Sequence, residues 1–143
     1  MERIKITLPG HFPFSTNIPI RITDLNYGNH VGNDTFLSLI HEARMQFFLH
    51  YGYTELQFAG VGLIMADVAI EFKREVLYGD TVTIHVVAAD FDKLGFDVFY
   101  KLMVTKEENE TLVGKAKTGM ICYDYELKKK VPIPAEALNK LQQ

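Results

Sequence analysis

The sequence predicts an α+β fold, in which one long helix is wrapped by a curved antiparallel sheet of about five to six strands. Two patterns predict it. Residues 33–51 carry apolar side chains around most of a helical circumference, which is typical of a helix that is enclosed rather than laid on a surface. Residues 64–122 then alternate apolar and polar side chains with a period of two between short polar turns, as consecutive antiparallel strands do.

The segment before the helix predicts two short strands. The first is expected over Arg3–Leu8, and an irregular stretch containing Phe12 and Phe14 follows it. The second is expected over Ile18–Thr23, where isoleucines occupy every second position. Because Pro19 has no N–H for a ladder hydrogen bond, this strand should lie at an edge of the sheet or begin there.

The helix is expected to begin with Asn33 as its N-cap and to end before Gly52 at C′. Asp34 falls in the first turn, where a carboxylate complements the helix dipole. A main apolar row recurs at helical spacing, and further apolar residues widen it; the row is Phe36, Ile40, Ala43 and Phe47, and the flanking residues are Leu37, Leu39, Phe48 and Leu49.

Four long strands and a short C-terminal helix complete the predicted order. The strands are expected over residues 64–73, 81–88, 96–102 and 112–122, and the helix over Ala135–Leu141. A sheet of this size covers one side of the long helix and leaves its edge strands open. Pairing an edge with a second copy of the chain would close it, so we expect a homo-oligomer, either a dimer or a tetramer.

The composition is that of a single globular domain over residues 1–143, with 48% apolar and 23% charged residues. No apolar run approaches the ~20 residues that span a bilayer, and no signal-peptide pattern occurs. We therefore expect a cytoplasmic protein without a membrane partner, in which Cys122 is a buried, inert thiol. The net charge of −3 argues against a nucleic-acid partner. Since neither a phosphate-binding glycine loop nor a zinc-ligand spacing occurs, we expect no cofactor and no metal.

The residues with chemical potential gather between Asp24 and Tyr53. A polar loop with the sequence DLNYGNHVGN runs into the start of the helix, where unpaired N–H groups meet the positive end of the helix dipole. These N–H groups suit an oxyanion, and they belong to Val31, Gly32, Asn33 and Asp34. The alternative is that Asn33 merely caps them.

Three carboxylates are candidates for catalysis. Glu42 lies within the apolar helix, where desolvation would raise its pKa towards that of a general base; alternatively it is solvated and paired with Arg21 or Arg44. Asp24 opens the loop and either acts on a substrate or fixes the loop through an Asx turn. Asp34 either serves the chemistry or only stabilises the first turn of the helix.

Two further loop residues can contact a carbonyl group. His30 can hydrogen-bond it or position the loop, whereas Asn26 can orient a water molecule or bind the carbonyl but cannot act as a base. Lys128, Lys129 and Lys130 attract phosphates or are solvated turn residues. An aromatic group either lines an acyl tunnel or packs in the core; it comprises Phe47, Phe48, Tyr51 and Tyr53.

Residues 17–134 resemble the hotdog-fold acyl-CoA thioesterases, and most closely the subgroup of 4-hydroxybenzoyl-CoA thioesterase. The resemblance rests on the loop DLNYGNHVGN, the helix segment HEAR and the later segment EFKREVLYGDTV. Family members commonly carry an Asp-x-Asp-x-x-Gly-His-Val-Asn-Asn pattern before the helix. The matching residues here are Asp24, His30, Val31 and Asn33, and Glu42 falls at a helix position where relatives carry an acidic residue.

The loop also departs from that pattern. The usual catalytic carboxylate of the family lies four residues before the His, at the position held here by Asn26. Asn29 stands in place of the Gly, and Gly32 in place of the first Asn. Acyl carrier protein thioesterases of the same fold place a functional Asn two residues before the His, where this chain has Gly28.

The resemblance implies an acyl-CoA thioesterase that acts on a small-molecule substrate. Thioester hydrolysis needs an oxyanion site and a carboxylate or His that activates water or attacks directly. The predicted catalytic residues are Glu42, Asp24, Asn26 and His30, and the predicted substrate-binding residues are Val31, Gly32, Asn33 and Asp34. The alternative is a hotdog protein that binds acyl thioesters without hydrolysing them. A hotdog dehydratase or hydratase is a third hypothesis, which the spacing of the His and the acid resembles less.

Overall fold

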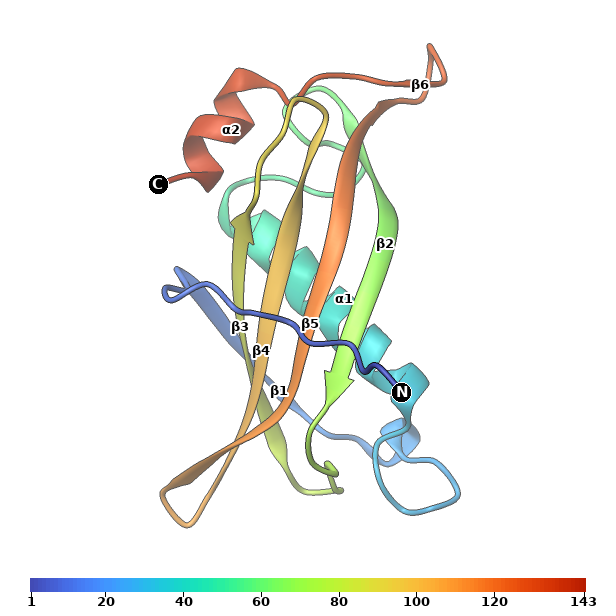
Figure 1. The fold of residues 1–143 in the computed structure, drawn as a ribbon, viewed down its shortest axis with the longest axis vertical. Coiled ribbons are helices and arrows are strands. Elements are labelled where there is room, and N and C mark those ends of the chain that lie inside the picture. The colour runs from blue at the N-terminus through green and yellow to red at the C-terminus, as the bar shows by residue number, and fades with distance from the viewer.

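The computed structural model describes all of residues 1–143 and confirms the α+β fold (Figure 1). One long helix, α1, lies against one face of a six-stranded sheet, and a short helix, α2, follows at the C-terminal end. The elements in chain order are β1 (Phe14–Pro19), the 3-10 turn η1 (Ile22–Asp24), α1 (Asn33–His50), β2 (Gly62–Phe72), β3 (Thr81–Ala89), β4 (Gly95–Lys106), β5 (Asn109–Asp124), β6 (Lys129–Lys130) and α2 (Ala135–Leu141).

The sheet is antiparallel throughout, with the strand order β1-β3-β4-β5-β2 and with β6 paired to β5. Strands β1 and β2 therefore form its two edges. The position of Pro19 at the end of β1 agrees with the edge placement that proline favours. Between Met65 and Asp67 the pairing of β2 with β5 shifts by one residue, so that a bulge interrupts this edge near its middle.

The core lies between α1 and the sheet. One face of the helix is buried through Phe36, Leu39, Ile40, Ala43, Phe47 and Phe48. The strands supply alternate residues to it, and Ile84, Val98 and Leu102 are fully buried there. Leu37 and Leu49, which were expected to widen the apolar row, are 37% and 58% exposed. The helix is thus covered from one side only in the single chain.

The predicted strand over Arg3–Leu8 is wrong. These residues belong to an extended N-terminal arm, residues 3–12, which crosses the face of the sheet opposite α1 (Figure 1). Its backbone bonds to side chains instead of a neighbouring strand: the N–H of Ile6 donates to Glu71 at 2.6 Å, and Lys115 donates to the Ile6 carbonyl at 3.3 Å. The first of these bonds, with a contribution from Lys73, holds the pKa of Glu71 below its usual value.

The predicted strand over Ile18–Thr23 is displaced. The ladder with β3 runs from Phe14 to Pro19, and the chain then turns into η1. Alternation of isoleucines suggested that the strand continues, but Ile20 is buried whereas Ile22 is 68% exposed. The turn forms because Asp24 accepts the backbone N–H of Arg21 at 2.8 Å and so caps η1.

A buried polar network joins α1 to the sheet. Arg44 of α1 is 5% exposed, and its Nε donates to Glu55 Oε1 at 2.5 Å. Its Nη1 donates to the Tyr100 hydroxyl at 3.3 Å, and that hydroxyl bonds to Thr118 Oγ1 at 2.7 Å. Burial raises the pKa of Tyr100, so its hydroxyl stays protonated in this network. No buried side-chain nitrogen or oxygen atom of the chain lacks a hydrogen-bond partner.

Cys122 is buried in β5, as predicted, and burial raises the pKa of its thiol to about 11. Neither helix combines the length and apolar character that a membrane crossing requires.

Candidate functional site

The loop between η1 and α1 closes on itself through the backbone of Asn26. The N–H of Asn26 donates to the His30 carbonyl at 2.9 Å, and the Asn26 carbonyl accepts the N–H of Asn29 at 3.1 Å. Asn29 has a φ of 63°, a left-handed conformation that asparagine tolerates better than most residues. The Asn26 side chain tightens the turn further, because its Oδ1 accepts the N–H of Gly28 at 2.9 Å.

His30 folds over this turn. Its Nδ1 lies 3.2 Å from the Val31 carbonyl, and when it donates there the other ring nitrogen, Nε2, is left as an acceptor. A Cβ atom placed on Gly28 would be 3.2 Å from both Nε2 of His30 and Oδ1 of Asn26. Glycine at position 28 therefore lets the two predicted catalytic side chains approach the same point of the loop.

The helix start differs from the prediction in its cap. Gly32, not Asn33, is the N-cap residue, and no side chain caps the helix. The N–H groups of Asn33 and Asp34 therefore have no acceptor within the helix and face outwards from its positive end. The N–H of Val31, by contrast, donates to the Val76 carbonyl at 2.8 Å, so this predicted oxyanion donor is already used.

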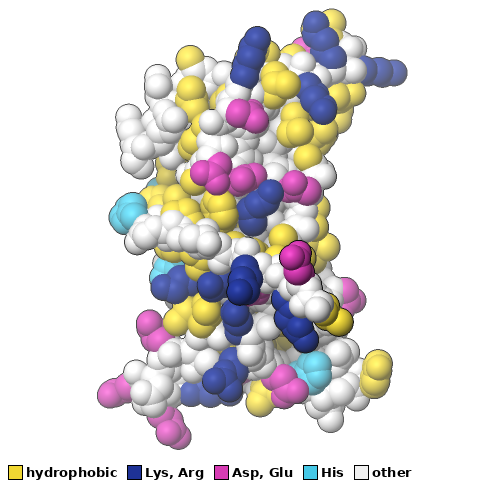
Figure 2. Space-filling model, viewed as in Figure 1, with side chains coloured by type: hydrophobic (Ala, Val, Ile, Leu, Met, Phe, Trp, Pro, Cys, Tyr) yellow, Lys and Arg dark blue, Asp and Glu magenta, His cyan; other side chains and the backbone are white.

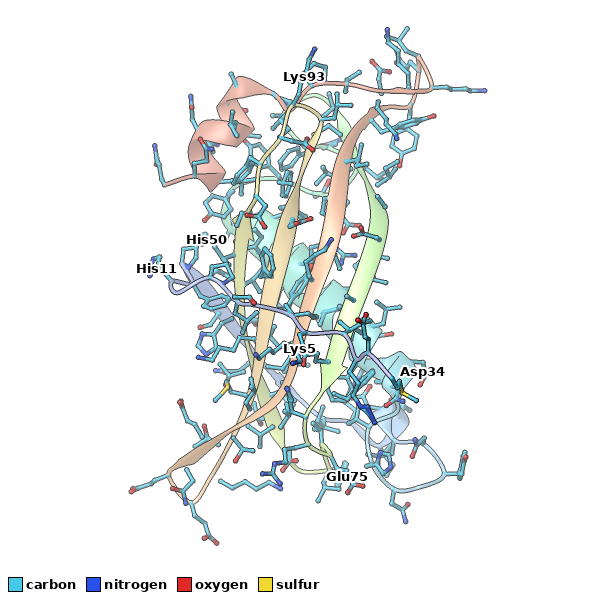
Figure 3. The ribbon with its side chains drawn as sticks, in the orientation of Figure 1. Lys5, His11, Asp34, His50, Glu75 and Lys93 are labelled. Atoms are coloured by element: carbon cyan, nitrogen blue, oxygen red, sulfur yellow. The ribbon has the colours of Figure 1, made fainter.

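Asp34 is the carboxylate of the first turn of α1 (Figure 3). Its Oδ1 is 2.6 Å from the place where a Cβ atom on Gly32 would lie, and Asn26 Nδ2 is 3.7 Å from the same place. Asp34, Asn26 and the N-cap residue are thus grouped around one end of α1.

A depression of about 220 Å³ opens at the start of α1, where Asn33 and His30 line it but Asp34 and Asn26 do not. It lies between the start of α1 and the end of β2, and its walls include His30, Val31, Asn33, Phe36 and Phe72. The rings of Phe36 and Phe72 meet edge to face at 5.2 Å. The site therefore combines an apolar wall, free backbone donors and a histidine, which is the combination that a thioester carbonyl with its acyl group would need.

Asp24 lies away from this depression and has a structural partner. Its side chain is 6% exposed, and Arg21 contacts it at 3.2 Å in addition to the capping bond in η1. These bonds run back to Arg21 and fix η1, so Asp24 has a structural role here, although not through the Asx turn that was the predicted alternative to catalysis.

Glu42 is exposed, so the desolvated environment expected for it is absent from the single chain. It pairs with neither Arg21 nor Arg44; its Oε2 accepts a hydrogen bond from Gln46 at 2.8 Å. Nine residues of α1 separate it from Asn33, which corresponds to about 13 Å along the helix axis. Glu42 and Asp24 instead line a separate depression of about 460 Å³ between β1 and α1.

The three consecutive lysines, Lys128–Lys130, lie in the turn and short strand β6 at the end of the molecule opposite the loop (Figure 1). The aromatic residues of α1 pack in the core. Phe47 and Phe48 are fully buried, and their rings lie 5.5 Å apart.

Lys73 and Arg74, which line the depression beside His30, were not predicted as site residues. They directly follow β2, so only the fold brings them next to the loop. The segment EFKREVLYGDTV, which contains both, is part of the family resemblance and is the signal that could have identified them.

Comparison with known proteins agrees with this architecture. A model of the thioesterase-like superfamily matches residues 20–141. No curated protein sequence matched the chain.

Solved structures match over most of the chain, at low sequence identity. A thioesterase-superfamily protein from Jannaschia sp. CCS1 has a TM-score of 0.82 and 15% identity, covering 93% of this chain and 83% of its own. DHNA-CoA thioesterase from Staphylococcus aureus has a TM-score of 0.78 and 17% identity, covering 90% and 89%. 4-Hydroxybenzoyl-CoA thioesterase from Pseudomonas sp. strain CBS-3 has a TM-score of 0.78 and 16% identity, covering 88% and 96%.

Proposed function

The chain belongs to the thioesterase-like superfamily, and we propose that it is an acyl-CoA thioesterase, which hydrolyses an acyl or aryl thioester to a carboxylic acid and free coenzyme A. The observation that carries the proposal is the uncapped start of α1. The N–H groups of Asn33 and Asp34 are free at this helix start, and Asn33 lines the same depression as His30 and Phe72. Structural neighbours that are named as CoA thioesterases support the choice of substrate class.

In this proposal the thioester carbonyl lies at the helix start, and its oxygen accepts hydrogen bonds from the N–H groups of Asn33 and Asp34. These donors stabilise the negative charge that develops on the oxygen when water attacks the carbonyl carbon. The tetrahedral intermediate then collapses, the carbon–sulfur bond breaks, and the thiol of coenzyme A leaves with a proton. His30 and Asn26 orient the carbonyl or the attacking water.

The carboxylate that activates the water is assigned first to Asp34, because it lies in the first turn of α1, beside Gly32. We expect Asp34→Asn to lower kcat by about 100-fold, as loss of a general base does. Glu42→Gln and Asp24→Asn remove the two carboxylates predicted first from the sequence. If Glu42→Gln or Asp24→Asn lowers kcat more than Asp34→Asn does, the assignment of the general base to Asp34 is wrong.

The activity itself is tested by release of free thiol from short, medium, long and aryl acyl-CoAs. We expect turnover with at least one of them. Absence of turnover with all substrates, together with measurable acyl-CoA binding, would support the alternative of a non-catalytic acyl-thioester-binding protein. We also propose that the protein is located in the cytoplasm.

We also propose that two copies pair through edge strand β2 to form a dimer. Both faces of this strand are exposed near its middle, where Met65 and Val68 are 42% and 40% exposed, and Phe72 at its end is 46% exposed. An unpaired strand with exposed apolar residues is a template for pairing with another chain.

Light scattering at micromolar concentration tests the dimer. We expect a dimer or a tetramer for the natural sequence and a shift towards the monomer for Val68→Lys, which places a charge in the proposed interface. Ile22→Lys is the matched control, because Ile22 is 68% exposed but follows β1 at the opposite edge. A natural chain that is monomeric contradicts the proposal.

A further inference from the structure

A second, larger depression adjoins the candidate site. Its volume is about 480 Å³, and it lies between the connection from β2 to β3 and the ends of β4 and β5. Three cationic side chains, Lys73, Arg74 and Lys106, line it together with Leu77, Val104 and Val113. Figure 2 shows Lys and Arg side chains on the lower half of the viewed face of the molecule and also around its upper end.

The cations of this depression are only partly neutralised. Lys73 pairs with Glu71 at 3.1 Å, and Lys106 pairs with Asp80 at 3.3 Å. The other oxygen of Asp80 accepts the N–H of Leu77 at 2.9 Å, so this carboxylate is held in place by the turn. Glu75 also lines the depression, but Arg74 makes no ion pair in the structure and its guanidinium is free to bind an anion.

The depression also offers a small apolar surface, which Leu77 supplies. Val104 and Val113 are buried at its base, and Leu77 is 41% exposed beside them. A flat ring can lie on such a surface while phosphate groups attached to it reach the surrounding cations. Apolar walls with a few polar groups that fix orientation are the usual composition of a small-molecule site.

The two depressions share a wall. Lys73, Arg74 and Glu75 line both of them, so a ligand that places its reacting end beside His30 and Asn33 can pass Arg74 and end near Lys106. This continuity gives one extended path from the helix start to the cationic surface.

We propose that this second depression binds the phosphate-bearing nucleotide end of the coenzyme A thioester. The inference rests on the proposed function and deepens it, because it assigns residues to the carrier half of the substrate. The adenine ring lies against Leu77, the exposed apolar side chain of the depression, and the phosphates contact Arg74 and Lys106. The proposal predicts a higher kcat/KM for an acyl-CoA than for the acyl-pantetheine with the same acyl group, which lacks the nucleotide.

The test compares an acyl-CoA with the acyl-pantetheine that carries the same acyl group. We expect the ratio of their kcat/KM values to fall about tenfold in the double variant Arg74→Gln/Lys106→Gln, since charge-assisted hydrogen bonds to phosphate are lost. Lys93→Gln is the matched control, because Lys93 is an exposed lysine at the opposite end of the molecule from Glu75 (Figure 3). It should leave the ratio unchanged.

Two kinetic results would overturn the inference. One is a double variant that keeps the natural ratio. The other is a triple variant, Lys128→Gln/Lys129→Gln/Lys130→Gln, that loses the preference for acyl-CoA over acyl-pantetheine while Arg74→Gln/Lys106→Gln keeps it. That result would place the phosphates at Lys128–Lys130.

Calorimetric titration with coenzyme A separates this inference from the proposed function. If no thioester is hydrolysed but coenzyme A binds about tenfold more weakly to the double variant than to the natural chain, the proposed function fails and the binding site stands. If coenzyme A binds equally to both proteins, or to neither, the binding site is wrong whatever the activity.

Discussion

We expect Glu55→Met to lower the free energy of unfolding by about 3 kcal/mol, because the substitution leaves the guanidinium of Arg44 buried without its anionic partner. Arg44 is 6% exposed in its side chain and Glu55 is 22% exposed, so the stranded cation has little access to water. Only the hydroxyl of Tyr100 would still contact it. Chemical denaturation monitored by circular dichroism measures the loss.

The double variant Arg44→Met/Glu55→Met shows whether the stranded charge causes this loss. Replacing both partners by apolar residues of similar length removes the buried charge, and such replacements are often close to neutral. We therefore expect the double variant to recover most of the stability lost in Glu55→Met. A double variant that is less stable than Glu55→Met would mean that the remaining interactions of Arg44 stabilise the fold by more than the desolvation of its charge destabilises it.

We expect Asn26→Asp to raise kcat with the best acyl-CoA substrate, by up to the roughly 100-fold that a positioned general base contributes where Asp34 does not already fill that role. The two side chains have the same shape, so Oδ1 of the carboxylate can keep the 2.9 Å bond from the N–H of Gly28. The second oxygen replaces Nδ2, on the side that faces Gly32 and the positive end of α1. A carboxylate is therefore introduced beside the free N–H groups without rebuilding the loop.

The neighbourhood of Asp34 favours a useful pKa for the new carboxylate. Both residues approach the same point next to Gly32, and two nearby carboxylates raise the pKa of one of them towards neutrality. Asn26→Ala is the control, since it removes the bond to Gly28 and supplies no base; we expect it to lower kcat. Steady-state kinetics of the three proteins on one substrate gives the comparison.

The result also separates the two functional hypotheses. An inactive natural chain with an active Asn26→Asp variant identifies a binding protein that keeps a thioesterase-like site but lacks its acid. Equal rates for the natural chain and the variant would show that position 26 does not face the reacting carbonyl.

The helix and the strands after it could be predicted because their signals are local. The row from Phe36 to Phe47 and the alternation over β2 to β5 are visible within short windows of sequence. The segment Arg3–Leu8 alternates too, but its bonding partners are the side chains of Glu71 and Lys115 far along the chain, and no local pattern identifies them.

The residues of the candidate site could be named from the sequence, but the hydrogen bonds that they form could not. The loop, the helix start and His30 were all found in the sequence. The use of the Val31 N–H by Val76 depends on where the connection after β2 passes, and the isolation of Glu42 depends on which face of α1 the sheet covers. Arg44 gave no signal as a core residue, because its burial requires Glu55 and Tyr100 to meet it from two other elements.

The N-terminal arm limits how more than two chains can assemble. It lies across the face of the sheet that α1 leaves free, where Ile6, Phe99 and Met103 are buried outside the main core. Stacking two sheets back to back through this face would place the arm, with its bonds to Glu71 and Lys115, between them. A tetramer assembled in this way would therefore contact the arm before it contacts the strands.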